Sequence, residues 1–417
     1  MSNTPGIPGW RAKALDNGYA AMRRLANADL VSAGIDSLLE FHGHFSETNE
    51  SLNLSTVKSA AVIRLDEIGD VVLTSPLLRE LRRNLPNADL TLVVRREIVP
   101  LVERCPYVNR VIGMPSSGRG GRGELRRMFS AWKLSKKRLW DLHLDLALLP
   151  RWDMDAAGAR LLAKLSGARW RVGFADPPLA PERLPPSPTS SETFLTQIVV
   201  GEQGMHEAQR PLELLKSIGG RVEDERLEIW TDDADEMEAE KLLQDARRPL
   251  VGMGIAALAD IKRWPVERFA AVARHLVEKY GAGIVLIGGP MDRELSKRMR
   301  DKLDFPVVDL VGRTTLRQTA AAIRRCAMYV GNDTGPLHMA AALGVPVVVV
   351  SCHPIGGDQA SQYSAARFGP WRVPSRVVQP IALPPCTSYC QSTGAHCIGN
   401  VSVEQVMAAV DELWPKP

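Results

Sequence analysis

Apolar and polar positions follow two alternating periods along most of the chain. Short uninterrupted apolar runs, such as residues 60–65 and 345–350, alternate with stretches in which apolar residues recur at every third or fourth position. The runs have the length of buried strands, and the recurring positions have the period of amphipathic helices. This alternation predicts parallel β-α-β units, so we expect an α/β protein.

The predicted elements form two groups, separated by a charged helix within residues 221–248. In the first group, strands are expected at residues 60–65, 89–94, 110–113, 141–149 and 170–174, and helices at 71–85, 98–104, 156–165 and 193–217. In the second group, strands are expected at 249–254, 284–287, 307–310 and 345–350 and in the run before Asn332, and helices at 266–280, 292–302, 316–325 and from Gly335 to Gly344. We therefore predict a helical N-terminal extension at 1–55 and a Rossmann-like domain at 56–245, with a Pro-rich excursion at 175–191. A second Rossmann-like domain is predicted at 246–417, ends in a helix and faces the first across a cleft.

One unit of the second group contains a candidate anion site. Its strand leads into Asn332-Asp333-Thr334-Gly335-Pro336-Leu337-His338, and the helix that follows ends at Gly344. Asp333 or Thr334 can cap this helix, Pro336 suits its first turn, and Gly344 suits the left-handed position after its end. The free amides at the helix start favour phosphate. Because any capped helix after a strand gives a similar pattern, the motif alone leaves a purely structural role open.

Composition narrows the class of protein. The 417 residues are 45% hydrophobic and 24% charged, as in a folded protein large enough for two domains. The net charge of +4 is small, so we expect no nucleic-acid partner. Apolar runs stay well below the roughly 18 residues of a membrane helix. Six cysteines in so long a chain do not form a disulfide framework, so we expect a cytoplasmic protein.

The helix predicted within residues 20–41 has an apolar face, which includes Leu25, Ile35 and Leu39. That face could lie on a lipid surface or pack on the body of the protein. We expect it to pack on the protein, because a lipid-surface helix usually has a larger and more basic polar face.

A basic segment at residues 118–140 is a candidate contact for an anionic partner. It contains Arg119, Arg122, Arg126, Arg127, Lys133, Lys136, Lys137 and Arg138, against the acidic Glu124. Most charge runs are solvated helix faces, and this interpretation stays open beside the functional one. The Gly-rich start of the segment favours a loop that leads into the helix and grips an anion.

Polar residues also follow the predicted strands. Residues 66–70 come after the first strand, and the loop at 150–155 brings Arg151 and Asp153 to the end of another, where functional loops of such sheets lie. Residues 252–257 approximate a dinucleotide fingerprint, but the following helix starts at Pro265 instead of at the third small residue, so we expect no dinucleotide. The loop instead presents Lys262 beside a helix start, where an ammonium group and the helix dipole both favour phosphate.

Together these motifs resemble glycosyltransferase family 9, the ADP-heptose:lipopolysaccharide heptosyltransferases. The matching segments are 63–65 with 68–79, 165–169 with 171–174, Lys262-Arg263-Trp264-Pro265, Gly288-Gly289-Pro290 and residues 332–338. The resemblance implies a GT-B fold and an inverting, metal-independent transfer of a sugar, with heptose from ADP-heptose as the expected donor group. The expected acceptor is a lipopolysaccharide or another cell-surface glycan at the inner face of the cytoplasmic membrane, which the protein would contact peripherally.

The resemblance also assigns roles to residues. It implies that Asp70 is the general base and that Lys262 neutralises the donor phosphates. The expected donor-binding residues are Gly288, Gly289, Asp292, Asp333, Thr334, Gly335, Pro336 and His338, of which His338 is expected to hold the loop. The expected acceptor-binding residues are Arg119, Arg122, Arg126, Arg127, Arg151 and Asp153. The chemistry agrees, because glycosyl transfer needs a cationic pocket for the leaving diphosphate and a carboxylate for the acceptor proton.

Several departures from the family pattern leave alternatives open. Ala256, Ala257 and Leu258 stand where hydroxyl residues are usual, Asp66 and Glu67 add charge before Asp70, and the 150–155 loop differs, which makes Asp153 a second candidate base. A different nucleotide sugar or acceptor on the same fold is therefore an alternative. A non-catalytic nucleotide-sugar-binding or scaffold protein is another, although the presence of both Asp70 and Lys262 argues against it.

Three cysteines near the C-terminus form a candidate metal site. Cys386, Cys390 and Cys397 lie close together in the sequence, beside His396, and such residues can bind zinc or iron. The spacing lacks the C-x2-C signature, so we expect no metal here and no cofactor beyond the nucleotide-sugar substrate.

Overall fold

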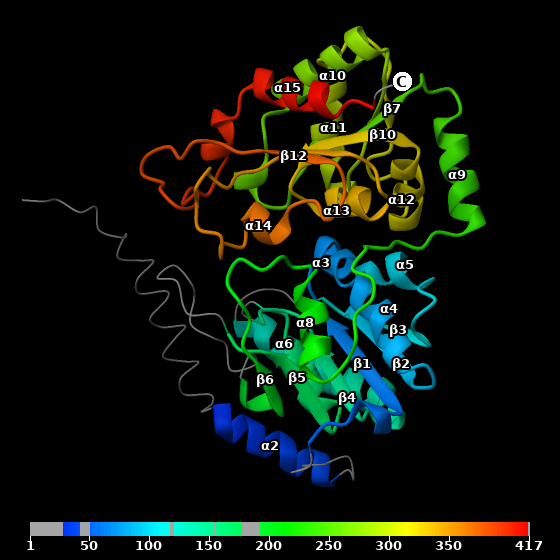
Figure 1. The fold of residues 1–417 in the computed structure, drawn as a ribbon, viewed down its shortest axis with the longest axis vertical. Helices are drawn as coiled ribbons and strands as arrows, with labels where there is room; N and C mark the ends of the chain where they lie inside the picture. The colour runs from blue at the N-terminus through cyan, green and yellow to red at the C-terminus, as the bar shows by residue number, and fades with distance from the viewer. Residues whose placement is uncertain (1–27, 42–50, 117–120, 153–154, 177–191, 416–417) are drawn as a thin grey trace, which may run out of the picture.

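A computed structural model describes residues 28–41, 51–116, 121–152, 155–176 and 192–415. Within these ranges the chain forms two parallel sheets of six strands each, and each sheet lies in its own domain with helices packed around it. Figure 1 shows the first domain in blue to green and the second in yellow-green to red. The two doubly wound domains form the GT-B arrangement, which confirms the predicted fold class.

The first sheet has the strand order β3-β2-β1-β4-β5-β6. Its strands are β1 Ser59–Arg64, β2 Asp89–Arg95, β3 Arg110–Met114, β4 Leu146–Leu149, β5 Trp170–Phe174 and β6 Gln197–Val199. Its helices are α3 Ile68–Leu73, α4 Ser75–Asn84, α5 Val99–Val102, α6 Gly121–Leu134, α7 Ala159–Leu165 and α8 Arg210–Ser217. Central strands such as β1 are buried along their whole length, because helices cover both faces of the sheet.

The second sheet has the order β12-β11-β10-β7-β8-β9. Its strands are β7 Leu250–Gly254, β8 Gly283–Leu286, β9 Val308–Asp309, β10 Cys326–Asn332, β11 Val347–Val350 and β12 Ser375–Val378. Its helices are α10 Val266–Tyr280, α11 Arg293–Arg300, α12 Leu316–Arg324, α13 Gly335–Ala342, α14 Ala365–Phe368 and α15 Val403–Leu413. Gly344 has a φ of +74° after α13, as its position in the sequence predicts.

Three elements differ from the sequence-based predictions. The helix predicted at 71–85 is two helices, because Pro76 in the first turn of α4 cannot continue the hydrogen bonds of α3. The strand predicted at 141–149 starts at Leu146, since a turn at Trp140–Leu142 and the left-handed His143 precede it. The helix predicted at 193–217 is wrong over its first part, where the edge strand β6 forms before α8.

The N-terminal helix α2, Ala28–Phe41, packs on the body of the first domain. Ile35 and Leu39 are buried in the core on one side of the first sheet, and Asp36 forms an ion pair with Lys164 of α7. The expected packing of this helix on the protein is therefore confirmed. In the part of the chain that the structure describes, no helix is long and apolar enough to cross a membrane.

The two domains contact each other through several helices. Helix α3 of the first domain packs against α13 of the second, and α5 lies against α12. Helix α9, Asp233–Leu243, also packs against α12, although it precedes the boundary expected near residue 245. That boundary remains a sequence-based prediction.

Candidate active site

A cavity of about 680 Å³ lies between the domains at the carboxyl ends of both sheets. Segments that follow β1, β3 and β4 line it from the first domain, and segments that follow β7 and β10 line it from the second. Among the predicted site residues, those that line it are Asp70, Arg127, Arg151, Lys262, Asp333, Thr334, Gly335, Pro336 and His338. Loops at the ends of parallel strands therefore meet at this cavity, as expected for ligand sites in open α/β sheets.

Asp70 lies in the first turn of α3 with its carboxylate held from two sides. Oδ1 accepts a hydrogen bond of 2.9 Å from Nη2 of Arg64, and Oδ2 accepts one of 3.2 Å from the backbone N–H of Glu67. Burial raises the pKa of Asp70 above its ordinary value, Arg64 opposes this rise and the nearby Asp66 charge adds to it. A carboxyl that is oriented and has a raised pKa is suited to proton transfer.

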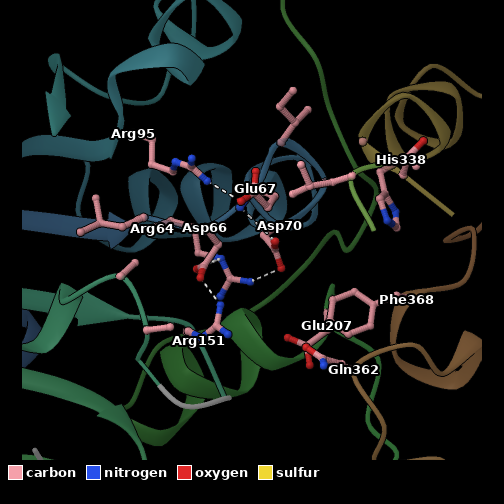
Figure 2. Close-up of a pocket in the computed structure, with 18 of the residues that line it drawn as sticks. Arg64, Asp66, Glu67, Asp70, Arg95, Arg151, Glu207, His338, Gln362 and Phe368 are labelled. Atoms are coloured by element: carbon pink, nitrogen blue, oxygen red, sulfur yellow. Dashed lines mark hydrogen bonds and ion pairs between the residues drawn. The ribbon is translucent and has the colours of Figure 1, made fainter. Parts of the chain in front are cut away.

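Arg64 connects Asp70 to a second carboxylate. Its Nε lies 3.0 Å from Oδ2 of Asp66, and Arg151 bonds the other oxygen of Asp66. Burial opposes ionisation of Asp66, but Arg151 and Arg64 outweigh burial and lower its pKa. Figure 2 shows these side chains meeting beneath α3, so Asp66 shares Arg64 with the candidate base. Sequence analysis gave no role to Arg64, although an arginine ending an apolar strand is an unusual feature.

Lys262 faces this group from the second domain. Its Nζ donates to Oδ2 of Asp333 at 2.8 Å and to the Asp333 carbonyl oxygen at 3.4 Å, and it lies 5.2 Å from the ring centroid of Tyr363. Burial disfavours its charge, but Asp333 outweighs burial and raises the pKa of Lys262. The ammonium therefore stays charged at neutral pH.

The start of α13 presents its backbone to the cavity. Thr334 is the N-cap residue, yet no side-chain bond caps the helix, because Asp333 pairs with Lys262 and the Thr334 hydroxyl lies 3.4 Å from the Asn332 carbonyl oxygen. Thr334 therefore occupies the predicted N-cap position, but neither its side chain nor that of Asp333 caps the helix with a hydrogen bond. The loop is fixed instead by the buried Asn332, which accepts from the Trp264 amide at 3.1 Å and donates to the Ile255 carbonyl at 2.9 Å.

His338 fills the contact between α13 and α3. Its side chain is 5% exposed, and Nε2 lies 3.9 Å from Oδ1 of Asp333. Burial lowers the pKa of His338 to about 4, so the ring is neutral at physiological pH. Its position fits the expected role of holding the loop.

A buried ion pair connects the domains at the rim of the cavity. Glu207, before α8, accepts from Nη2 of Arg367 at 2.6 Å and from Nε of Arg210 at 3.0 Å. The ring of Trp152 has Arg210 at 3.7 Å and Arg367 at 4.8 Å from its centroid. Glu207 and Arg367 line the cavity and were missed from the sequence, because 160 positions separate them.

Other predicted site residues lie elsewhere. Gly288, Gly289 and Asp292 do not line the described cavity, and the Asp292 carboxylate accepts from the Gly289 amide at 2.8 Å. Arg126 is exposed on α6, away from the cavity lining. Arg119, Asp153, the side chain of Arg122 and most of the Pro-rich excursion lie outside the described residues.

The cysteines near the C-terminus converge. The ligand atoms of Cys386, Cys390, His396 and Cys397 all lie within 4.8 Å of one another, although the sequence spacing favoured no metal. The fold of the segment brings together side chains that lie up to 11 positions apart in the sequence.

Two Rossmann-like domains that face each other across one cavity have the GT-B architecture, and the cavity holds a carboxylate on one side and a cationic, amide-rich loop on the other. Residues 190–351 match the family model described as glycosyltransferase family 9 (heptosyltransferase). The chain is therefore similar to family 9 glycosyltransferases, which confirms the predicted resemblance and the prediction that the protein is an enzyme.

Curated relatives and solved structures agree with this assignment. Lipopolysaccharide heptosyltransferase 3 of Escherichia coli is 25% identical over 67% of this chain and 78% of its own length. Lipopolysaccharide heptosyltransferase 2 of Salmonella typhimurium is 27% identical over 68% of this chain and 79% of its own length. A family 9 glycosyltransferase structure from Veillonella parvula covers 86% of this chain and 97% of its own, with a TM-score of 0.66 and 22% identity. The structure of E. coli ADP-heptose LPS heptosyltransferase II covers 85% and 98%, with a TM-score of 0.62 and 21% identity.

Proposed function

We propose that the protein transfers a heptose, with inversion, from ADP-heptose to a lipopolysaccharide or another cell-surface glycan. The observation that carries this proposal is the position of Asp70 across one cavity from Lys262 and the start of α13. The names of the curated relatives support heptose as the sugar and lipopolysaccharide as the acceptor.

In the proposed reaction Asp70 takes the proton of the acceptor hydroxyl as its oxygen bonds to the anomeric carbon of the sugar. The bond from that carbon to the diphosphate breaks, and the leaving nucleotide diphosphate keeps the electron pair. A single displacement of this kind inverts the anomeric configuration. Asp70 needs no covalent bond to the sugar, so one carboxylate suffices.

Lys262 and α13 would stabilise the charge that grows on the leaving group. An ammonium has three N–H donors, and Asp333 accepts two of them, at its carboxylate (2.8 Å) and at its carbonyl oxygen (3.4 Å), so the third can bond a phosphate oxygen. The positive end of α13 adds a partial charge at Gly335. These groups supply the electrostatic stabilisation that a divalent cation supplies in other transferases, and we propose a metal-independent transfer step.

The acceptor would enter from the side of the first domain. Arg127 of α6 and Arg151 line the cavity there, paired with Glu124 and Asp66. The outer surface of α6 exposes Leu125 and Phe129 at 60% and 61%, next to exposed lysines. An apolar and basic surface beside an acceptor entrance suits peripheral contact with an anionic membrane that carries the acceptor.

A different nucleotide sugar is the second candidate. Leu258 lines the cavity with 82% of its surface exposed, at a position where the family resemblance leads us to expect a hydroxyl residue. An apolar side chain at this position offers no hydrogen bond to phosphate or sugar. This observation favours a donor whose contacts differ from those of ADP-heptose.

Calorimetry with ADP, UDP, GDP and ADP-heptose would test the donor, and NMR of the product anomer would test inversion. We expect binding of ADP and ADP-heptose, and turnover that added Mg²⁺ does not increase. Asp70→Asn should reduce turnover by about 10²-fold or more while nucleotide binding persists, as for loss of a general base. Lys262→Ala should weaken nucleotide binding. Parent-like turnover by Asp70→Asn would place the base elsewhere, with Asp153 as the next candidate.

A further inference from the structure

A compact cluster of three thiols and an imidazole lies beyond the cavity, in the segment between β12 and α15. Cys386, Cys390 and Cys397 are buried with at most 5% of their surface exposed, and His396 is partly buried beside them. The Nδ1 atom of His396 lies 3.5 Å from Sγ of Cys386 and 3.4 Å from Sγ of Cys397.

These distances fit a metal-ligand set. With metal–sulfur bonds of about 2.3 Å and metal–nitrogen bonds of about 2.0 Å, a tetrahedron has sulfur–nitrogen edges of roughly 3.5 Å. All four ligand atoms lie within 4.8 Å of one another, so a small movement of the side chains completes the tetrahedron. The backbone N–H of Gln391 also donates to Sγ of Cys386 at 3.3 Å, as N–H groups do around metal thiolates.

The segment around the cluster has little else to hold it. Residues 379–396 are all described, and none of them forms a helix or a strand. The hydrophobic cluster there consists of the three cysteines with Leu383 packed against them. Segments too small to bury a core of their own are usually stapled by a disulfide or a metal, and the cysteines here are free thiols.

We propose that Cys386, Cys390, His396 and Cys397 bind one tetrahedral transition-metal ion, zinc or iron(II), with a structural role. Three thiolates and one imidazole are a ligand set that both metals accept. Each coordinating thiol releases its proton to solvent as the metal binds. The four protein ligands fill the tetrahedron, so this metal takes no part in the transfer step.

The bound metal would brace a loop on the donor side of the cavity. Ser388, between two of the ligands, accepts a hydrogen bond of 2.8 Å from the Asp358 amide. The Asp358 loop leads to Tyr363, which lines the cavity beside Lys262. A metal that fixes Ser388 therefore also fixes the segment that carries Tyr363.

Elemental analysis of the reduced full-length protein, purified without chelator, tests the site independently of activity. We expect close to one zinc or iron per chain, and a loss of at least ten-fold in Cys390→Ser and in His396→Ala. Cys105→Ala, which removes a buried cysteine outside the cluster, should keep the metal. Metal-free protein that also fails to bind added Zn²⁺ or Fe²⁺ would overturn the proposal, as would a disulfide between two of the cluster cysteines.

Two further measurements cover variants that fail to fold. Cobalt(II) exchanged into the parent protein should give the visible absorption bands of a tetrahedral thiolate site, and their absence would contradict the assignment. Hydrogen exchange at the Asp358 amide should become faster in metal-depleted parent protein, whereas unchanged exchange there would overturn the bracing role. The metal readouts need no sugar transfer, so they stand or fall separately from the proposed reaction.

Discussion

Gly69 of α3 and His338 of α13 are in direct contact across the domain interface: a β-carbon built on Gly69 would lie 2.5 Å from Cδ2 of His338. The imidazole is buried, so it has little room to move. Glycine at position 69 thus sets how closely the helix that carries Asp70 approaches the helix that starts at the donor loop.

Gly69→Ala should separate these helices. We expect unfolding to become easier by about 1–3 kcal/mol, as for an overpacked core, and turnover to fall because Asp70 moves relative to Lys262. Denaturant unfolding and steady-state rates measure the two effects. Gly34→Ala is the control, since a β-carbon there has no neighbour within 4 Å. The cost should shrink when His338→Ala is combined with Gly69→Ala, and full additivity would refute the steric explanation.

Asp66→Asn should shift the pH dependence of the reaction. The Asp66 charge raises the pKa of Asp70 and competes for Arg64, so its removal lowers that pKa. A base works in its ionised form, and the acid limb of kcat/KM should therefore move to lower pH. As a control, Asp141→Asn changes an exposed carboxylate and should leave the acid limb in place. If Asp66→Asn also leaves the acid limb in place, Asp66 does not influence the pKa of the base.

Two buried histidines should make the protein sensitive to acid. Burial lowers the pKa values of His206 and His338 to about 4. In the neutral ring of His206, Nδ1 accepts a hydrogen bond of 3.0 Å from the Ala208 amide, and Nε2 lies 2.9 Å from the Gly369 carbonyl oxygen. The unfolded chain protonates both near pH 6.5, so unfolding takes up protons. Stability is therefore full above pH 6.5 and falls toward pH 4, by up to about 1.4 kcal/mol per pH unit for each histidine.

Denaturant unfolding between pH 7 and pH 4 measures this loss. His206→Gln and His338→Gln should each flatten the curve, whereas His143→Asn, at an exposed position, should not. Equal slopes in the parent and in both glutamine variants would show that other groups cause the acid sensitivity.

Helix α6 should bind anionic vesicles. Phe129 packs beside Trp132 at 5.9 Å between ring centroids, Lys136 lies 5.5 Å over the Trp132 ring, and Lys133 and Lys137 are exposed nearby. Sedimentation with phosphatidylglycerol vesicles should retain the parent, and salt should weaken retention. Phe129→Ser and the pair Lys136→Glu with Lys137→Glu should reduce it several-fold. As a control, changing Lys241 and Lys297, which are exposed on other helices, to Glu should have little effect. Equal losses of vesicle binding in the two double variants would show that α6 contributes only its positive charge.

Local periodicity predicted most of the fold because each signal lies within a few residues. Helix α10 and strand β5 match their predicted bounds, since their apolar positions repeat cleanly between clear breaks. Strand β6 was missed because it has three residues and exposes Ile198 at 47%, which leaves no alternating pattern to detect. Edge strands of this kind depend on their partner strand more than on their own sequence.

The candidate site also contains residues with a local sequence signal and contacts that have none. The sequence pointed to Asp70, Lys262 and residues 333–336, because each follows a recognisable strand. It could not reveal that Asp333 would pair with Lys262 instead of capping α13, or that His396 would meet three thiols, because both depend on contacts between distant or folded-back segments.

The ion pair between Glu207 and Arg367 limits how the two domains can move. The side chains of Glu207 and Arg367 are 2% and 1% exposed, so separating the domains there would break a buried ion pair. Breaking such a pair costs about 3–5 kcal/mol. A domain motion that keeps this pair in contact would have to be a rotation about Glu207 and Arg367. The ion pair would then act as a hinge, and the free energy needed to open the domains about it would set how long the nucleotide stays bound after each transfer.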